Sequence, residues 1–362
     1  MSLSKNKKSA LQKTKSDPSL NLSQTSAERI KNLRRQSRDI KKLTEGILSG
    51  NKTDLSQAIT LIESQSQRHT VDIKTIISTC LPHSNNSLRI GITGVPGVGK
   101  STFIEQLGLL LVNKGHKVAV LAVDPSSSVT RGSILGDKTR MEKLVQHPMA
   151  YIRPTASGES LGGVARKTRE SILLCEAAGY DILLIETVGV GQSETAVHSM
   201  TDFFLLLKLA GAGDELQGIK RGIIEMADAI VINKADGDNI KAAKKAKVEF
   251  NRALHMYPSK SNGWEPKVKL ASALQNEGID KVWRMLADYF EKAKKNGYFE
   301  EKRAHQNKFW LTQTIEDTLK KEFYQNEIIK NEFPEVLKKI HNQDLSPFEA
   351  AEYLLKKAKI QE

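Results

Sequence analysis

A glycine-rich stretch from residue 94 to residue 101 constrains the fold of this chain more than any other feature. Its sequence, Gly94-Val95-Pro96-Gly97-Val98-Gly99-Lys100-Ser101, fits the pattern G-x-x-x-x-G-K-[ST]. It directly follows the apolar run 88–93 and precedes a helical pattern from Thr102 to Asn113, and this strand–loop–helix context is the one that the pattern requires. The glycines let backbone N–H groups surround a phosphate, and the helix adds its positive N-terminal end. The stretch predicts a phosphate-binding loop in which Lys100 reaches the β- and γ-phosphates and the Ser101 hydroxyl binds Mg²⁺.

Short apolar runs alternate with helical patterns throughout the centre of the chain. They are bounded by Gly, Pro, Asp or Asn and lie at residues 88–93, 118–123, 151–153, 182–185, 203–207, 229–232 and 268–271. Continuous apolar strands separated by helices are typical of a mainly parallel sheet with helices on both faces. We therefore predict an α/β fold of the P-loop NTPase class, flanked by helical extensions at the N- and C-terminal ends.

Composition divides the chain into four segments. Residues 1–26 are rich in Ser, Lys, Thr and Asn and predict a disordered basic arm. Apolar residues at helical spacing in residues 27–86 predict an N-terminal helical extension. The sheet-forming block spans residues 87–290. The motifs described in the following paragraphs predict that this block is a P-loop GTPase domain. Residues 291–362 are rich in Lys, Glu, Leu and Ala and predict a C-terminal helical hairpin.

The last helix of that hairpin has a recognisable start. Ser346 is followed by Pro347 and, three residues after the serine, by Glu349. A serine at the N-cap, a proline in the first turn and a glutamate at the third position satisfy the free N–H groups of a helix end. This pattern predicts a helix that begins at Pro347.

The net charge of +13 comes mainly from one end of the chain. Residues 1–42 contain twelve Lys or Arg against three acidic residues, which accounts for nine of the thirteen charges. This distribution favours a solvated basic tail. The other 320 residues are nearly balanced in charge and give no indication of a nucleic-acid-binding surface. Contact of the arm with RNA or with a membrane, and a mitochondrial transit peptide, are the alternatives.

Hydropathy and cysteine content exclude several classes of protein. No window holds 18 uninterrupted apolar residues, which excludes a transmembrane helix, and no apolar segment of a secretory signal follows the start. Cys80 and Cys175 are too few for a disulfide scaffold and have no Cys or His at metal-ligand spacing, which excludes a zinc module. A reducing compartment, the cytoplasm, fits best.

A second motif selects the base of the nucleotide. Asn233-Lys234-Ala235-Asp236 closes the apolar run 229–232, at a position where ligands gather in open α/β sheets. The Asp236 carboxylate can accept hydrogen bonds from the N1–H and exocyclic amine of guanine, which adenine does not offer, and the Lys234 stem can cover the ring. Ser272-Ala273-Leu274 follows the next run and suits a backbone contact to the guanine carbonyl. The bound nucleotide is therefore predicted to be GTP or GDP.

Three carboxylates are candidates for the metal and for the response to the γ-phosphate. Asp124 ends the run 118–123, Asp137 lies in a predicted loop, and Glu186 ends the apolar run 182–185 before a glycine-rich loop. Carboxylates beside a phosphate-binding loop can hold Mg²⁺ through its waters, because Mg²⁺ takes few protein ligands. We expect Mg²⁺ to be held by Ser101, Asp124, Asp137 and Glu186, and the glycines after Glu186 to let the loop change shape when the γ-phosphate leaves.

These motifs together resemble the MeaB/ArgK family of GTPases. The resemblance covers residues 30–362 and rests on the following stretches: Gly94–Thr102, Asp124-Pro125-Ser126-Ser127, Gly136-Asp137-Lys138-Thr139-Arg140-Met141, Glu186-Thr187-Val188-Gly189-Val190-Gly191-Gln192-Ser193-Glu194 and Gly211–Gly222. The string that begins at Glu186 is highly specific to the family. We find no departure from the family pattern within these motifs.

The resemblance implies a function that spacing alone does not give. Members of the family are chaperones of methylmalonyl-CoA mutase and related adenosylcobalamin-dependent mutases, and GTP hydrolysis gates loading of intact cofactor and rejection of damaged cofactor. Asp124 and Asp137 would belong to a first switch, Glu186 to a second, and Lys220 to a third that transmits nucleotide state to the mutase. The residues 291–362 would form a homodimerisation arm. Lys100, Asp137 and Glu186 would be the catalytic residues.

Three rival functions have distinguishable signatures. An ATP-dependent kinase of a transport protein is disfavoured by Asn233–Asp236, because this motif is predicted to select guanine over adenine. A nickel-inserting GTPase needs Cys/His clusters, which this sequence lacks. An RNA-targeting GTPase is motivated by the basic arm, but seven methionines in the whole chain are too few for a Met-rich RNA-binding domain.

Overall fold

A seven-stranded parallel sheet forms the centre of the computed structural model, which describes residues 39–64, 66–123, 141–155, 161–187, 193–211, 221–258, 260 and 262–359. The strands are β1 (Leu88–Gly94), β2 (Val118–Val123), β3 (Ala150–Thr155), β4 (Ile182–Thr187), β5 (Phe203–Lys208), β6 (Ala229–Ile232) and β7 (Lys267–Leu270). Their order is β3-β2-β4-β1-β5-β6-β7, and every neighbouring pair is parallel. The predicted α/β fold is confirmed.

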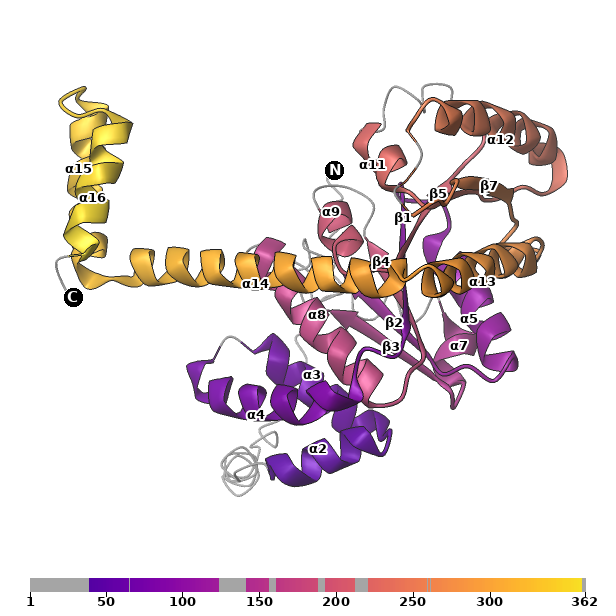
Figure 1. Ribbon diagram of the computed structural model, residues 1–362, viewed down its shortest axis with the longest axis horizontal. Coiled ribbons are helices and arrows are strands. Elements are labelled where there is room, and N and C mark those ends of the chain that lie inside the picture. Colours follow the sequence, from indigo (N-terminus) through magenta and orange to yellow (C-terminus); the bar gives the residue numbers. More distant parts are fainter. Residues whose placement is uncertain are drawn as a thin grey trace, which may run out of the picture.

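Helices cover both faces of the sheet (Figure 1). They are α2 (Ile40–Leu48), α3 (Lys52–Glu63), α4 (Thr70–Cys80), α5 (Lys100–Asn113), α7 (Glu142–Gln146), α8 (Leu161–Ala177), α9 (Ser193–His198), α11 (Arg221–Met226), α12 (Ile240–His255), α13 (Ile279–Lys295), α14 (Tyr298–Gln325), α15 (Glu327–His341) and α16 (Pro347–Lys359). Successive side chains of a strand point to opposite faces, so Phe203 joins the cluster under α5 and α13 while Phe204 joins the cluster under α8 and α9. This double burial explains why the strands are apolar without alternation.

The strand boundaries follow the predicted runs closely, with one informative difference. The run predicted at residues 151–153 is extended in the structure to Ala150–Thr155 and includes Pro154. Proline cannot donate to a neighbouring strand, and it is tolerated here because β3 is the last strand on its side of the sheet.

The N-terminal helices pack against the sheet rather than away from it. Within the helical extension predicted for residues 27–86, the described residues form α2, α3 and α4, and the short 3-10 turn Gln67–His69 lies between α3 and α4. Leu55, Ile59 and Ile76 from these helices are fully buried in the cluster that also contains α8. Gly50 and Asn51 separate α2 from α3: Gly50 has φ +80°, and the Asn51 side chain accepts hydrogen bonds from the backbone N–H groups of Thr53 and Asp54 at the start of α3.

The C-terminal residues form a projecting arm rather than the simple hairpin predicted for 291–362. The 28-residue helix α14 crosses the molecule and continues beyond it, and α15 and α16 pack together at its far end (Figure 1). The predicted start of the last helix is confirmed, because the Glu349 backbone N–H donates to Ser346 Oγ at 3.2 Å and the Ser346 N–H donates to Glu349 Oε2 at 3.1 Å. The predicted boundary between residues 290 and 291 falls inside helix α13, which runs without a break from Ile279 to Lys295.

Candidate functional site

The glycine-rich stretch joins β1 to α5 at the carboxyl end of the central strand. Helix α5 begins at Lys100, two residues earlier than the periodicity predicts, with Gly99 as its N-cap at φ +92°. The Lys100 ammonium donates to the carbonyl oxygens of Gly94 at 2.8 Å and Val95 at 3.3 Å, so the side chain folds back over the loop. Only 8% of Lys100 is exposed. The loop therefore holds a cation across its opening, as the predicted phosphate-binding role requires, and that role stays a prediction.

The end of β4 places a carboxylate beside the first turn of α5. Ser101 Oγ donates to Glu186 Oε1 at 3.3 Å, and both residues are buried. Next to them, the Thr187 hydroxyl donates to the Thr93 hydroxyl at 2.9 Å, which ties the end of β4 to the end of β1. A hydroxyl and a carboxylate so close together supply the oxygen donors that Mg²⁺ prefers. Two of the four predicted metal ligands are thus brought together.

The other predicted switch residues lie outside the described part of the chain. These are Asp124, Asp137, Lys220 and the loop at 188–192, and the predicted basic arm at 1–26 lies outside it as well. Within the described residues, no three His, Cys, Asp or Glu side chains form a group that could hold a metal ion by themselves. Among the described residues, the Ser101 hydroxyl and the Glu186 carboxylate are the pair of predicted ligands that could contribute oxygen donors to a metal here.

The predicted guanine motif is bonded directly to the phosphate loop. Asn233 Nδ2 donates to the Val98 carbonyl at 2.8 Å, and Lys234 Nζ donates to the Gly97 carbonyl at 2.9 Å. Gly99 is required for this approach, since a Cβ there would lie 2.8 Å from Asn233 Nδ2. The motif and the loop, about 135 residues apart in sequence, therefore form one continuous site.

The residues after β7 complete the base side of the site. Asn233 Oδ1 accepts from the Ala273 backbone N–H at 3.2 Å, and the Ser272 hydroxyl donates to Asp236 Oδ2. Leu274 is 78% exposed and adjoins these residues in the chain. Lys234 has φ +55°, a left-handed conformation that turns the chain sharply after β6. Every predicted base-contacting residue is thus gathered at the same edge of the sheet as the phosphate loop.

Two features of the site were not predicted from sequence. The Thr93–Thr187 hydrogen bond and the cross-links from Asn233 and Lys234 to the loop depend on strand order, which motif spacing does not give. The only available signal was that all of these residues end apolar runs, and carboxyl ends of parallel strands meet at one edge of a sheet.

Comparison with known proteins identifies the family. The family model described as methylmalonyl-CoA mutase-associated GTPase MeaB matches residues 55–328. The chain belongs to this family. A relative from Caulobacter vibrioides, described as a putative GTPase, is 47% identical over 317 residues that cover 88% of the chain and 97% of the relative. The methylmalonic aciduria type A homolog, mitochondrial, of Mus musculus is 43% identical and covers 89% of the chain and 80% of that protein.

A solved structure supports the same fold. The crystal structure of a LAO/AO transport system kinase is 38% identical, has a TM-score of 0.71 and covers 88% of the chain and 96% of that structure. The P-loop NTPase fold of this MeaB family member is therefore shown by sequence and by structure. Within the described residues, no helix combines the length and the hydropathy needed to cross a membrane.

Proposed function

We propose that this protein binds GTP and hydrolyses it to GDP and phosphate at the site formed by the phosphate loop and the guanine motif. The observation that carries the proposal is the direct bonding of Asn233 and Lys234 to the carbonyls of Val98 and Gly97. This bonding supports the proposal because it holds the motif proposed to select guanine next to the loop proposed to bind phosphate. The nucleotide-binding residues we assign are Gly94, Val95, Pro96, Gly97, Val98, Gly99, Lys100, Ser101, Thr102, Asn233, Lys234, Asp236, Ser272, Ala273 and Leu274.

The roles of the side chains follow from their positions. Lys100 stabilises negative charge on the β- and γ-phosphates, and the loop amides position them, which is most of what phosphoryl transfer requires. Ser101 and Glu186 would hold Mg²⁺ together with Asp124 and Asp137, and the ion would supply further neutralisation of phosphate charge. Glu186, joined to Ser101 at 3.3 Å, also begins the glycine-containing loop that senses the γ-phosphate in this proposal.

We propose further that the nucleotide state governs a mutase partner. The family description names methylmalonyl-CoA mutase, and the resemblance of the switch motifs supports a chaperone that gates adenosylcobalamin loading and protects or reactivates that mutase or a related one. No intrinsic arginine finger is evident in the sequence, so hydrolysis by the isolated protein should be slow. The partner would complete the site or stabilise its active arrangement.

GTP turnover with and without methylmalonyl-CoA mutase tests this proposal. We expect a rise of about tenfold or more when the mutase is added, since a group or a rearrangement worth ~1.4 kcal/mol in the transition state changes the rate tenfold. Bovine serum albumin at the same concentration controls for non-specific stabilisation. Turnover that ignores the mutase would retain the GTPase and reject this client.

A kinase of a transport protein is the second candidate, because the related solved structure bears that description. The guanine motif speaks against ATP as the donor. Excess ATP should leave GTP turnover unchanged if the site selects guanine, and strong competition by ATP would favour the kinase.

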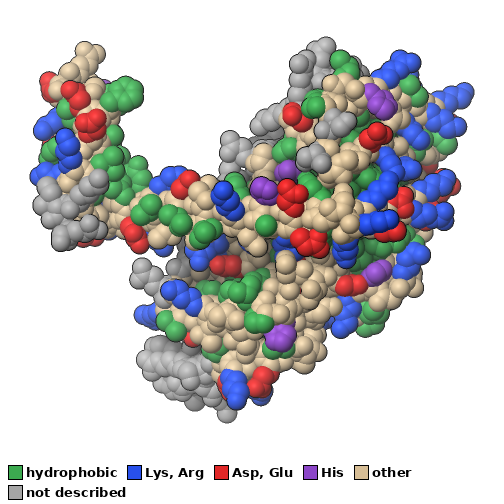
Figure 2. Space-filling view, viewed as in Figure 1, with side chains coloured by type: hydrophobic (Ala, Val, Ile, Leu, Met, Phe, Trp, Pro, Cys, Tyr) green, Lys and Arg blue, Asp and Glu red, His purple; other side chains and the backbone are tan. Residues whose placement is uncertain are grey.

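The C-terminal arm supports a homodimer as the assembly. Leu311, Ile315 and Leu319 lie at four-residue intervals on α14 and are at least half exposed. Figure 2 shows apolar side chains along the arm. Unpartnered apolar stripes of this kind mark protein interfaces. We propose that the arm of a second copy covers this face in an isologous contact.

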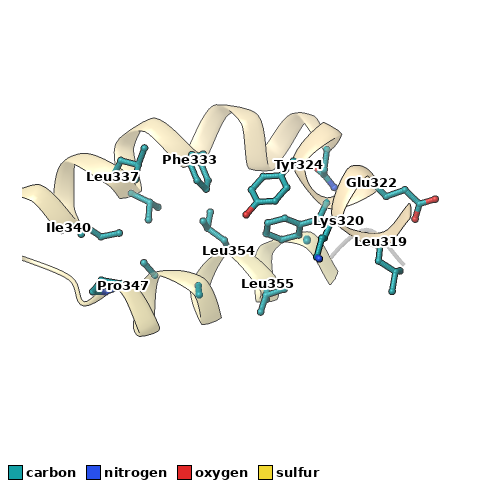
Figure 3. A pocket seen from close by; sticks show the side chains of 16 residues that line it. Leu319, Lys320, Glu322, Tyr324, Phe333, Leu337, Ile340, Pro347, Leu354 and Leu355 are labelled. Carbon is teal, nitrogen blue, oxygen red and sulfur yellow. The ribbon is translucent and has the colours of Figure 1, made fainter. Parts of the chain in front are cut away.

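An apolar cavity at the end of the arm extends this surface. It has a volume of about 1100 Å³ and lies between the end of α14 and the helices α15 and α16. Phe333, Tyr324 and Leu354 point towards one another between the helices (Figure 3). An open cavity lined by such side chains can accept apolar side chains of the second copy.

Replacing Leu319 by glutamate should convert the dimer to a monomer. Leu319 is 61% exposed, so the change should leave the fold intact while placing a charge in the proposed interface. Sedimentation velocity of the two proteins at micromolar concentration measures the outcome, with Lys321→Glu on the same helix as the control. A wild-type protein that sediments as a monomer, or a variant that remains dimeric, would reject this interface.

The remaining assignments are proposals of organisation and location. We propose that α2–α4 and the arm of α14–α16 flank the nucleotide-binding unit as extensions, and that the basic arm at 1–26 precedes them. We propose a cytoplasmic location, with no membrane or nucleic-acid partner; the mouse relative is described as mitochondrial.

A further inference from the structure

A short segment, Ser199–Asp202, joins α9 to β5 and is held along its whole length by one face of α14. Lys302 Nζ donates to the Asp202 carbonyl at 2.7 Å, and Gln306 Nε2 donates to the Thr201 carbonyl at 2.9 Å. Trp310 Nε1 donates to the Ser199 carbonyl at 3.4 Å. We call these four residues the anchor segment.

The strongest contact to the anchor segment is ionic. The Arg303 guanidinium makes two hydrogen bonds to the Asp202 carboxylate and a third to the Ser87 carbonyl at 2.9 Å, and only 4% of Arg303 is exposed. Burial lowers the pKa of Lys302, and the carboxylates of Asp228 and Asp202 oppose that shift. A paired, fork-shaped contact of this kind fixes direction as well as distance. The anchor segment therefore helps to fix the orientation of α14, together with Asn85 and Ser87 before β1 and Arg169 of α8, which also bond to α14.

The α14 residues that hold the segment form a single stripe. Positions 302, 306 and 310 recur every four residues, and position 303 lies three residues before 306, so the four lie on one face of the helix. Three of the contacts go to backbone carbonyls rather than to side chains. The stripe therefore follows the path of the backbone between α9 and β5, and a shift of that backbone must either move α14 or break several buried hydrogen bonds.

Helix α9, which precedes the anchor segment, lies against the strands that carry the proposed nucleotide site. Helix α9 packs on β1 and β4, whose carboxyl ends carry the phosphate loop and Glu186. A Cβ at Gly91 of β1 would lie 3.0 Å from Thr201 Oγ1 and 3.1 Å from Val197 Cγ1, so there is no free space between the strand and this element. Close packing transmits displacement because it leaves no gap to absorb it.

The arm would enlarge any such displacement. Between Trp310 and Gln325 the helix α14 runs on beyond the anchor for about 22 Å, and a rotation of ~10° at the anchor would move its end by about 4 Å. Figure 1 shows α15 and α16 at that far end. A small rotation at the anchor would therefore become a larger displacement at the far end of the arm.

We propose that the anchor segment couples the nucleotide site to the C-terminal arm, with Gln306 and Trp310 as positioning residues. The proposal rests on the GTP-binding function proposed above. When the γ-phosphate alters the elements after β4, α9 and the anchor segment shift, and α14 turns with them. The coupling is reciprocal, so a partner that holds the arm changes the affinity of the site for GTP relative to GDP.

Distances between spin labels test the coupling in the full-length protein. Labels are placed at Gln325→Cys at the exposed end of α14 and at Asn113→Cys at the exposed end of α5, while the native Cys80 and Cys175 are buried. Labelled chains are diluted into unlabelled protein, so that distances within one chain are measured. Between GDP and a non-hydrolysable GTP analogue we expect the mean distance to change by up to about 4 Å, because the displacement derived from the helix rise sets the upper limit.

The double substitution Gln306→Met/Trp310→Phe removes two of the anchor hydrogen bonds; methionine keeps the approximate size of glutamine, and phenylalanine keeps an aromatic ring at position 310. We expect at least half of the distance change to be lost in this variant, with nucleotide affinity retained. Gln313→Met is the matched control, because the Gln313 side chain bonds only to Glu316 on the same helix. If the double variant melts early, the same comparison is made with Gln306→Met alone.

The outcomes separate the coupling from the proposed function. Equal distances in the two states of a protein that binds both nucleotides would overturn the coupling and leave the GTPase proposal standing. A full distance change in the folded double variant would overturn the role of the anchor segment. Failure to bind any guanine nucleotide would overturn both proposals.

Discussion

Replacing Lys100 by alanine is expected to reduce GTP hydrolysis by about 10²- to 10³-fold, the loss typical of removing one preorganised donor from a transition state. The Lys100 ammonium lies across the phosphate loop, 2.8 Å from the Gly94 carbonyl oxygen, and is buried. No other described lysine bonds to the carbonyl oxygens of Gly94 or Val95. Single-turnover hydrolysis of radiolabelled GTP at saturating protein measures the loss of the chemical step separately from weaker binding.

Lys114→Ala is the matched control for this variant. Lys114 lies at the opposite end of the same helix and is exposed, so its removal changes the net charge equally and leaves the loop untouched. Thermal unfolding of both variants checks that the fold persists. Hydrolysis by Lys100→Ala within about twofold of wild type would reject the phosphate-loop assignment, since twofold corresponds to only ~0.4 kcal/mol.

Replacing Asp236 by asparagine should change the preferred base. The carboxylate of Asp236 accepts from the Ser272 hydroxyl and, in the proposed complex, from the N1–H and the exocyclic amine of guanine. Asparagine would present an N–H group to that amine, and losing two charge-assisted hydrogen bonds should weaken GTP binding by about 100-fold or more. Xanthine carries a carbonyl in place of the amine, so the asparagine can donate to it, and xanthosine triphosphate should bind the variant better than GTP does.

Equilibrium titration with fluorescent analogues of both nucleotides measures this exchange. Asp238→Asn, at an exposed position two residues away, removes the same charge without touching Ser272 and should leave GTP affinity unchanged. A variant that loses both nucleotides equally would indicate a collapsed site. Unchanged GTP affinity would show that Asp236 does not contact the base.

Local patterns predicted the elements of the fold well because burial on both faces leaves a direct mark on each strand. The runs 118–123 and 229–232 have the same bounds in the structure, and the cap formed by Ser346 and Glu349 is present as predicted. The ends of helices were predicted less accurately than the bounds of strands. Gly99 adopts φ +92° as the N-cap of α5, so the helix starts at Lys100, although hydrophobic periodicity begins only at Thr102.

The arm shows where periodicity stops being informative. A hairpin was predicted for residues 291–362, but Tyr298–Gln325 is one continuous helix, and the hairpin is formed by α15 and α16. Apolar residues such as Leu311 and Ile315 have helical spacing whether they pack within the chain or remain exposed. Sequence spacing reveals that a face is apolar; it does not reveal what covers the face.

The sequence by itself determined the chemistry of the phosphate loop and the guanine motif. Lys100, Ser101, Asn233 and Asp236 carry that chemistry in their side chains and in short fixed spacings, so no knowledge of the fold was needed to name them. Only the tertiary structure decided that Asn233 and Lys234 bond to the loop and that Ser101 bonds to Glu186. It also decided that α14 forms hydrogen bonds to the anchor segment. These contacts join residues more than 80 positions apart, and they depend on the order of strands in the sheet, which local sequence does not encode.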